Sequence, residues 1–353
     1  MPAARRGELF LVVGGLATAL VLGEAVAHLL RPGATPSSYP RVRLAGANGG
    51  PFNSLGYRDR ERSKEKPTGV RRIVSLGDSF AWGWGILLDD TYARRVERML
   101  TERRVQKETW DDVSLASPGL NSVQEAERLS AEGFAYCPDV VVLGYVLNDS
   151  DDQHAPEVKR TADWLRNADA TPWAGWPVLR HSALVRLLAT RIRATVDNRR
   201  RVEGRRATYA PGYPGWIAGQ KALREMAGMC RERGVPLVIL IFPDLGVPLD
   251  DRYPFTAIHA QVRTVAIAAG ARVVDLLPSF RGLNSELLVV AGVDDTHPNE
   301  IAHRIAALAL FDALREVLPP PGEGMPHSCS DGRPRAAARA AERRGSAESR
   351  KGV

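Results

Sequence analysis

The stretch Arg72-Ile73-Val74-Ser75-Leu76-Gly77-Asp78-Ser79-Phe80 decides how the chain folds. Its first half, residues 72–76, is short and mostly apolar, which is typical of a buried strand. A glycine and two polar residues follow at once and predict a sharp turn. In open α/β sheets, ligands bind beyond the carboxyl ends of the strands, so Ser79 stands where a nucleophile would stand. A serine at a helix start is also a common N-cap, and both interpretations remain open here.

The same rhythm of short apolar runs and amphipathic stretches continues to about residue 317. Strands that alternate with helices predict an α/β fold with a mostly parallel sheet, covered by helices on both faces. The expected strands are residues 72–76, 113–116, 140–143, 236–242 and 271–275, and the expected helices are residues 91–104, 122–135, 220–233, 256–269 and 298–317.

A basic insertion, residues 150–214, interrupts this rhythm. Between Glu157 and Arg206, twelve basic residues face five acidic ones, which accounts for the whole net charge of +7. The sequence pI near 9.5 therefore reflects one local segment, and no nucleic-acid partner is expected. The arginine-rich run from Arg191 to Arg206 predicts either a contact with an acidic polysaccharide or anionic lipid, or a solvated helix face.

The N-terminus predicts export. Arg5 and Arg6 precede an apolar segment, residues 9–30, which is long enough for a membrane-spanning signal anchor. The same residues also fit a cleavable signal peptide with an Ala25-x-Ala27 site. We expect a protein anchored in the cytoplasmic membrane with its catalytic domain outside, or one secreted after cleavage.

The domain organisation follows from these segments. Residues 1–33 are the anchor or signal peptide, residues 34–71 a linker and N-terminal extension, and residues 72–318 the catalytic domain. Residues 319–353 contain too little apolar surface to fold, and we expect a disordered tail.

The composition is that of a globular protein, with 353 residues of which 44% are hydrophobic and 25% charged. The three cysteines, Cys137, Cys230 and Cys329, are widely spaced, so they build neither a disulfide framework nor a zinc site. At most one disulfide can form. No metal site or phosphate-binding loop is recognisable, and no cofactor is expected.

A serine nucleophile needs a base, and the base needs an orienting acid. His297 is the candidate base because it lies in a polar loop before the last helix, with Asp294 three residues earlier. Asp151 and His154 repeat the same spacing, which makes His154 the alternative base. His297 is preferred because its loop opens a helix, whereas His154 begins the insertion.

Acyl transfer also needs hydrogen-bond donors for a developing oxyanion. Gly119 follows the second expected strand and can offer a backbone N–H, and Asn148 follows the third strand and can offer its amide. Taken singly, each is more simply a turn residue. Together with Ser79, they place polar groups at the carboxyl ends of three successive strands.

These blocks, Gly77-Asp78-Ser79, Gly119, Asn148-Asp149 and Asp294-x-x-His297, resemble in order the four blocks of the SGNH/GDSL hydrolases. The resemblance implies a flavodoxin-like three-layer α/β/α sandwich and a Ser-His-Asp triad. It implies Ser79 as nucleophile, His297 as base and Asp294 as orienting carboxylate. The oxyanion hole would then consist of the Ser79 and Gly119 N–H groups and the Asn148 amide.

Two positions depart from the family pattern. Phe80 replaces a leucine, and Val146 stands where the third block usually has glycine. The segment Asn53-Ser54-Leu55-Gly56-Tyr57-Arg58, after an N-terminal membrane segment, also resembles exported bacterial members of the family.

The expected function is a serine esterase acting on an acylated carbohydrate or a related lipid ester, without a metal. Trp82 and Trp84, just past the nucleophile, can line the substrate pocket or pack in the core. Two alternatives remain: an O-acyltransferase that modifies an extracellular polysaccharide, and a non-catalytic carbohydrate-binding module of the same fold.

Overall fold

The structure is a computed structural model that describes residues 3–29, 51–103, 109–151, 182–290 and 296–318. The chain divides into two compact units. The first comprises residues 1–41 and 153–203, and the second comprises residues 42–152 and 204–353. Each unit is described by itself.

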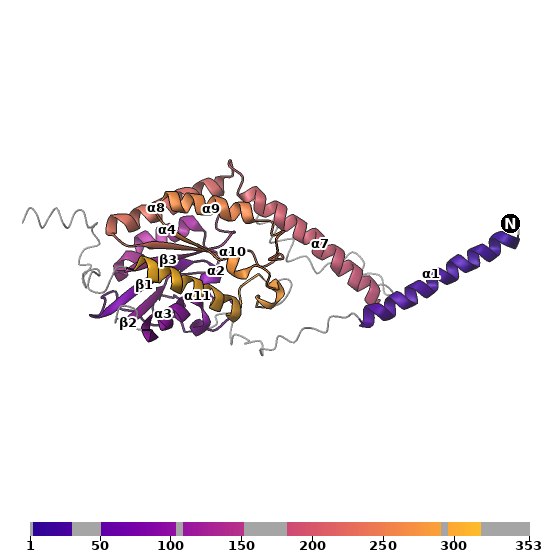
Figure 1. Cartoon of the computed structure of the whole chain (residues 1–353), viewed down its shortest axis with the longest axis horizontal. Coiled ribbons are helices and arrows are strands. Elements are labelled where there is room, and N and C mark those ends of the chain that lie inside the picture. Colours follow the sequence, from indigo (N-terminus) through magenta and orange to yellow (C-terminus); the bar gives the residue numbers. More distant parts are fainter. Residues whose placement is uncertain (1–2, 30–50, 104–108, 152–181, 291–295, 319–353) are drawn as a thin grey trace, which may run out of the picture. The chain divides into compact units, whose positions relative to one another are not determined.

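The centre of the second unit is a sheet of five parallel strands in the order β2-β1-β3-β4-β5 (Figure 1). The order reverses at β1, which lies between β2 and β3, and such a switch point is where open α/β sheets bind ligands. This is the flavodoxin-like arrangement that the sequence predicts. The strands are β1 (Val70–Gly77), β2 (Thr109–Ser114), β3 (Val140–Tyr145), β4 (Leu237–Ile241) and β5 (Arg272–Asp275).

Helices cover both faces of the sheet and complete three layers (Figure 1). One layer contains α3 (Tyr92–Glu102) and α11 (Glu300–Val317), which pack against each other. The other contains α4 (Ser122–Ala131), α8 (Pro214–Arg233) and α9 (Thr256–Ala268). Short helical turns connect these elements: α2 (Ser79–Trp82), η1 (Leu88–Asp90), η3 (Gly133–Tyr136), α10 (Leu277–Phe280) and η4 (Ser285–Leu287).

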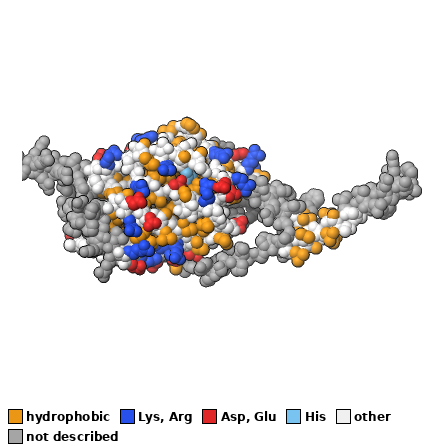
Figure 2. All heavy atoms as spheres, in the orientation of Figure 1, with side chains coloured by type: hydrophobic (Ala, Val, Ile, Leu, Met, Phe, Trp, Pro, Cys, Tyr) orange, Lys and Arg blue, Asp and Glu red, His pale blue; other side chains and the backbone are white. Residues whose placement is uncertain are grey.

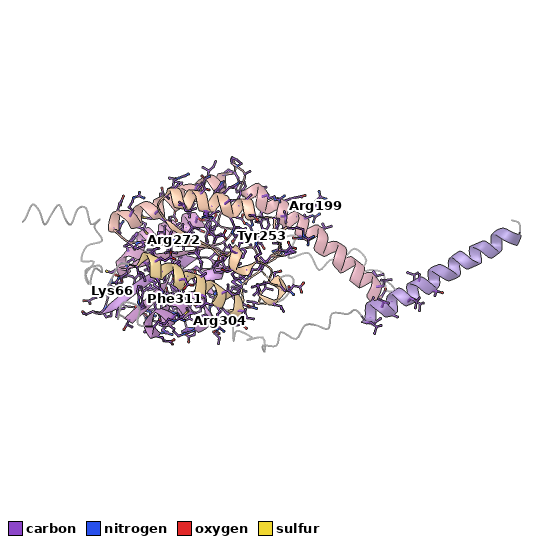
Figure 3. The ribbon with its side chains drawn as sticks, viewed as in Figure 1. Lys66, Arg199, Tyr253, Arg272, Arg304 and Phe311 are labelled. Atoms are coloured by element: carbon purple, nitrogen blue, oxygen red, sulfur yellow. The ribbon has the colours of Figure 1, made fainter. Side chains whose placement is uncertain are left out.

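Because both faces of the sheet are covered, β3 and β4 consist almost entirely of apolar residues. β4 is buried along its whole length, and so is β3, which supplies three consecutive valines. Lys66 and Arg272 lie toward the amino ends of the strands, whereas Tyr253 lies toward the carboxyl ends (Figure 3). The loops beyond the carboxyl ends carry the predicted site.

Two elements begin well before their expected first residues. β2 begins at Thr109 rather than at residue 113, because the charged Asp111 and Asp112 belong to the strand and are neutralised by arginines. α8 begins at Pro214 rather than at residue 220, with the proline in the first turn, where its missing N–H is tolerated.

Part of the expected insertion is a long helix, α7 (Ala183–Thr208). In the arginine-rich part of this helix, Arg199 is exposed and pairs with Glu203 one turn later (Figure 3). At this position the helix is the solvated face that the sequence offered as one of two interpretations. Arg205 instead is largely buried and pairs with Asp151 in the second unit. Figure 2 shows acidic and basic side chains interspersed on the visible face, with no single-sign field.

Residues 51–69, which belong to the expected linker and N-terminal extension, pack against the α/β fold. Arg58, Asp59 and Lys66 are almost completely buried. Lys66 binds Asp139 at 2.9 Å, just before β3. Polar side chains therefore attach this segment to the domain, which is why apolar patterning did not reveal it.

The first unit contains α1 (Ala3–Leu29) and the first part of α7. Glu24 of α1 caps the N-terminus of α7, accepting hydrogen bonds from the Ser182 hydroxyl at 2.6 Å and from the Leu184 N–H at 3.0 Å. These bonds lower the pKa of Glu24 to about 2. Among the described residues, no helix combines the length and the apolar character needed to cross a membrane, so the expected membrane-spanning helix is not confirmed.

Candidate active site

The Gly77-Asp78-Ser79 turn lies at the carboxyl end of β1, at the switch point of the sheet. Gly77 has a φ of +144°, and an added Cβ would lie 2.6 Å from the Cβ of Ala81, so only glycine fits this turn. Asp78 caps α2 by accepting a hydrogen bond of 2.8 Å from the Phe80 N–H. The strand, the glycine and the cap together fix Ser79 as the first residue of α2.

Ser79 and His297 are in hydrogen-bond contact. The distance from Ser79 Oγ to His297 Nε2 is 3.0 Å, although the two residues are 218 positions apart in sequence. A serine hydroxyl bound to an imidazole can lose its proton as it attacks an electrophile. This contact is the central chemical feature of the site.

The loop that carries His297 is held on both sides. Its backbone pairs with the preceding segment, where the Val290 N–H donates to the His297 carbonyl at 3.0 Å and the Asn299 N–H donates to the Leu288 carbonyl at 2.8 Å. Asn299 also caps α11 through its side chain, as the polar start of that helix indicated. The imidazole is therefore presented from a fixed backbone.

Asp78 joins the nucleophile to the third strand. This fully buried carboxylate accepts a hydrogen bond from the Asn148 amide at 3.1 Å, and its Oδ2 lies 3.4 Å from Ser79 Oγ. Burial raises the pKa of Asp78, while its hydrogen bonds and the nearby His297 oppose that rise. Asp78 belongs to the Gly77-Asp78-Ser79 block, but no role for it was predicted from the sequence.

The two other predicted donors follow the neighbouring strands. Asn148 lies in a turn after β3 that is closed by the Val146 N–H donating to the Asp149 carboxylate at 3.1 Å. Val146 therefore fits within a hydrogen-bonded turn. Gly119, with a φ of +80°, lies in the loop after β2, and Ser117 attaches this loop to the Gly77 carbonyl at 3.1 Å.

The two predicted aromatic residues differ in environment. Trp82 is buried, with the guanidinium of Arg58 4.7 Å from its ring centre. Trp84 is 41% exposed, and its ring centre lies 5.7 Å from that of His297. Arg58 was noted only as part of a motif, yet it holds the loop after α2 by donating to the carbonyls of Trp82, Gly83 and Ile86.

Two predicted residues, Asp294 and His154, lie outside the described residues. Two other histidines are engaged in the core. His303 accepts a hydrogen bond from the Tyr92 N–H at 3.0 Å, and burial lowers its pKa to about 3, which keeps it neutral. His259 contacts Asp275 at 2.8 Å and Tyr253 at 3.3 Å, so both ring nitrogens are occupied. Neither is placed to serve as a base.

Comparisons with known proteins identify the family of the chain. The sequence model of the GDSL-like Lipase/Acylhydrolase family matches residues 75–305. A search of curated proteins finds no significant match.

Among solved structures, the chain is similar to a lipase/acylhydrolase from Enterococcus faecalis, with 17% identity, a TM-score of 0.43, and coverage of 71% of this chain and 98% of that one. It is also similar to an acetylxylan esterase from Geobacillus stearothermophilus, with 15% identity, a TM-score of 0.44, and coverage of 74% and 97%. The esterase EstA from Pseudoalteromonas sp. shows 15% identity, a TM-score of 0.39, and coverage of 70% and 97%.

The family match spans more than half of the chain and includes Ser79, Asn148 and His297. The chain therefore belongs to the GDSL-like lipase/acylhydrolase family and is a carboxylic ester hydrolase.

Proposed function

We propose that the chain is an exported serine esterase that removes acyl groups, O-acetyl groups above all, from a carbohydrate or a related ester. In this proposal Ser79 is the nucleophile, His297 the general base and Asp294 the carboxylate that orients the imidazole. The 3.0 Å contact between Ser79 Oγ and His297 Nε2 is the observation that carries it.

The reaction proceeds in two halves. His297 Nε2 takes the Ser79 proton while Oγ attacks the ester carbonyl, and a tetrahedral oxyanion forms. The C–O bond to the alcohol then breaks, and the alcohol leaves with the proton from His297. Water, deprotonated by the same imidazole, attacks the acyl-serine and releases the acid.

The oxyanion is held by three donors in this proposal. The Ser79 N–H belongs to the first turn of α2, where N–H groups have no acceptor within the helix. The Gly119 N–H comes from the loop after β2. One N–H of the Asn148 amide donates to Asp78, which fixes the amide and leaves the second N–H for the substrate.

A carbohydrate substrate is supported by Trp84. Its partly exposed indole lies beside His297, where the alcohol part of an ester would leave. A flat apolar ring face suits the apolar face of a sugar ring. Trp82, buried beneath it, supports Trp84 through a ring contact of 5.7 Å.

Export is supported by two observations. Arg5 and Arg6 lie near the start of α1 (Ala3–Leu29), before its apolar part, and basic residues typically flank a membrane segment on its cytoplasmic side. Cys137 is disulfide-bonded, and disulfides persist in oxidising compartments. The cap that Glu24 provides to α7 favours a mature protein that retains α1, because cleavage after Ala27 would remove it.

The nucleophile and the base are tested by p-nitrophenyl acetate hydrolysis with Ser79→Ala, His297→Ala and His154→Ala. We expect the first two variants to lose activity by about 10³-fold or more and His154→Ala to keep it, because only the first two break the proton-transfer pair. Wild-type rates in Ser79→Ala, or loss of activity in His154→Ala alone, would contradict the assignment.

A separate test with an acetyl donor and a panel of oligosaccharides identifies the acyl acceptor, which is water or a sugar hydroxyl. Hydrolysis predicts free acetate as the product at every acceptor concentration. Acetylated sugar formed at the expense of acetate would instead identify the O-acyltransferase. Binding of oligosaccharides without turnover of any ester would identify the non-catalytic module.

A further inference from the structure

Two buried carboxyl groups lie near Asn148, one in the turn that carries Asn148 and one in the helix that contacts this turn. Glu125 is in the first turn of α4 and is 0% exposed, and Asp149 directly follows Asn148 and is 2% exposed. The N-terminus of α4 contacts the turn, since the Ser122 N–H lies 3.4 Å from the Asp149 carbonyl. Neither carboxyl has a part in the reaction described above.

Three of the four oxygens of these carboxyl groups lack a hydrogen-bond donor. Both oxygens of Glu125 and the Oδ1 of Asp149 are buried without a partner, and so are the Tyr92 hydroxyl and the Ser122 hydroxyl. Natural proteins rarely leave buried polar atoms unsatisfied, and an ionised carboxylate without a donor is especially costly. We therefore expect the two carboxyl groups to hold a proton, which supplies a donor that the side chains around them do not.

Burial and the nearby carboxylates favour the protonated form of both groups. Burial raises the pKa of Glu125 well above its ordinary value, and the charge of Asp78 raises it further, while Arg128 opposes the rise. Burial, Glu125, Asp78 and Asp151 raise the pKa of Asp149, and its hydrogen bond from the Val146 N–H opposes the rise. Arg128 is already bound to the Leu115 carbonyl and the Ser117 hydroxyl, and Asp151 to Arg205.

The remaining neighbours are neutral phenols. Burial raises the pKa of the Tyr92 and Tyr145 hydroxyls well above the ordinary value, and nearby carboxyl groups, Glu125 among them, raise both further. The Tyr92 hydroxyl fits over Gly144, where an added Cβ would come within 2.5 Å of it. In the described part of the chain, no group of three or more carboxylates, imidazoles or thiols is placed to hold a metal ion.

We propose that Glu125 and Asp149 share one proton and that this pair positions Asn148 for the oxyanion, so that Glu125 is a positioning residue of the reaction. The proposal rests on the proposed function, because it assigns a role through Asn148. With the proton in place, Asp149 accepts from both Glu125 and the Val146 N–H, and the 146–149 turn stays closed. Loss of the proton leaves two like charges in a buried site, and their repulsion opens the turn and displaces the amide from Asp78.

The test compares Glu125→Gln with wild type in the pH dependence of kcat, using p-nitrophenyl acetate from about pH 6 to about pH 10. The glutamine amide supplies a permanent donor. Glu125→Gln should therefore keep kcat within about threefold near pH 7 and lose the alkaline decline that wild type shows when the pair ionises. Glu125→Ala, which has no donor, should lower kcat about tenfold or more with little change in KM.

Glu127→Gln is the matched control, because Glu127 is an exposed glutamate on the same helix. Its profile should overlay that of wild type. An alkaline decline in Glu125→Gln identical to that of wild type, or an unchanged kcat in Glu125→Ala, overturns the proposal. If Glu125→Ala does not fold, as judged by its circular dichroism, the glutamine variant decides alone.

Ser79→Ala distinguishes a failure of the proposed function from a failure of the shared-proton proposal. If it is as active as wild type, the proposed function fails. If it is inactive while Glu125→Gln keeps the wild-type alkaline decline, only the shared proton fails.

Discussion

In the proposed mechanism, Trp84 contributes to substrate binding and takes no part in bond making. Its ring lies next to His297, while Trp82 beneath it is buried against Arg58. The loop between them is held by the three carbonyl contacts of Arg58. An indole presented on such a fixed loop loses little entropy when a substrate stacks on it, so it can contribute directly to binding.

We expect Trp84→Ala to lower kcat/KM for an acetylated oligosaccharide about tenfold, mostly through KM, because the stacked sugar face is lost. Hydrolysis of p-nitrophenyl acetate, which has no sugar ring, should fall much less. Leu87→Ala removes another exposed apolar side chain from the same loop and serves as the control. An equal loss with both substrates would show that Trp84 acts on His297 and not on the sugar.

Single residues were predictable where position in the fold limits the choices. Ser79 and His297 follow the ends of strands or open a helix, and both features leave a mark in the sequence. The burial of Glu125 could also have been predicted from the sequence. Glu125 lies four residues before Leu129 and is buried with it, so helical periodicity places this glutamate on the inner face of α4. Asp78 could not be assigned, because its partner Asn148 is 70 residues away.

At the scale of elements, β2 and α3 are joined by charge as well as by apolar packing. Asp112 of β2 is fully buried and accepts a hydrogen bond of 2.5 Å from the Ser75 hydroxyl. Its other oxygen has no hydrogen-bond donor and lies 4.0 Å from the Arg94 guanidinium. Burial raises the pKa of Asp112 to about 6, with Arg94 of α3 opposing that rise. Such a carboxyl group is protonated more readily in the folded chain than in the unfolded one.

The free energy of unfolding should depend on this group. Its contribution is fully present below the unfolded pKa near 3.8 and is lost as the pH rises through about 6. We therefore expect Asp112→Asn to be close to wild type near pH 4 and more stable than wild type above pH 7, by at most about 3 kcal/mol. Urea unfolding at several pH values measures the difference, with the exposed Asp89→Asn as control. A difference that is constant with pH would contradict the raised pKa.

The predicted boundaries were wrong where an element begins with charged residues or a proline and not with an apolar pattern. The strand expected at residues 113–116 is really β2 (Thr109–Ser114), because Asp111 and Asp112 are paired with arginines inside the fold. The helix expected from residue 220 begins at Pro214, whose position in the first turn is a recognised start signal. α7 was not predicted as a continuous helix, since its arginine-rich sequence has a weak apolar face. β3 and β4, buried on both faces, were located almost to the residue.

At the scale of the whole molecule, the candidate site and the segment proposed to direct export belong to different units. Ser79, Asn148 and His297 all belong to the unit formed by residues 42–152 and 204–353, whereas α1 belongs to the other unit. The sheet, its two helix layers and the site were predictable because each depends on local periodicity and on strand ends. The cap from Glu24 to α7 was not, because nothing local links residue 24 to residue 182.

This division predicts that removing residues 1–41 changes where the protein resides and leaves its chemistry intact. A chain that starts at Val42 keeps every described member of the site, and we expect its p-nitrophenyl acetate kcat to stay within about twofold of the full-length value. In a bacterial host, the full-length chain should be exported and should keep α1, which the intact mass of the purified protein reports. The shortened chain should stay inside the cell. Ser79→Ala in the shortened chain controls for background hydrolysis. A shortened chain that is folded but inactive would show that the first unit contributes to the site, and a mature mass lacking residues 1–27 would show that Glu24 is cleaved away before it can cap α7.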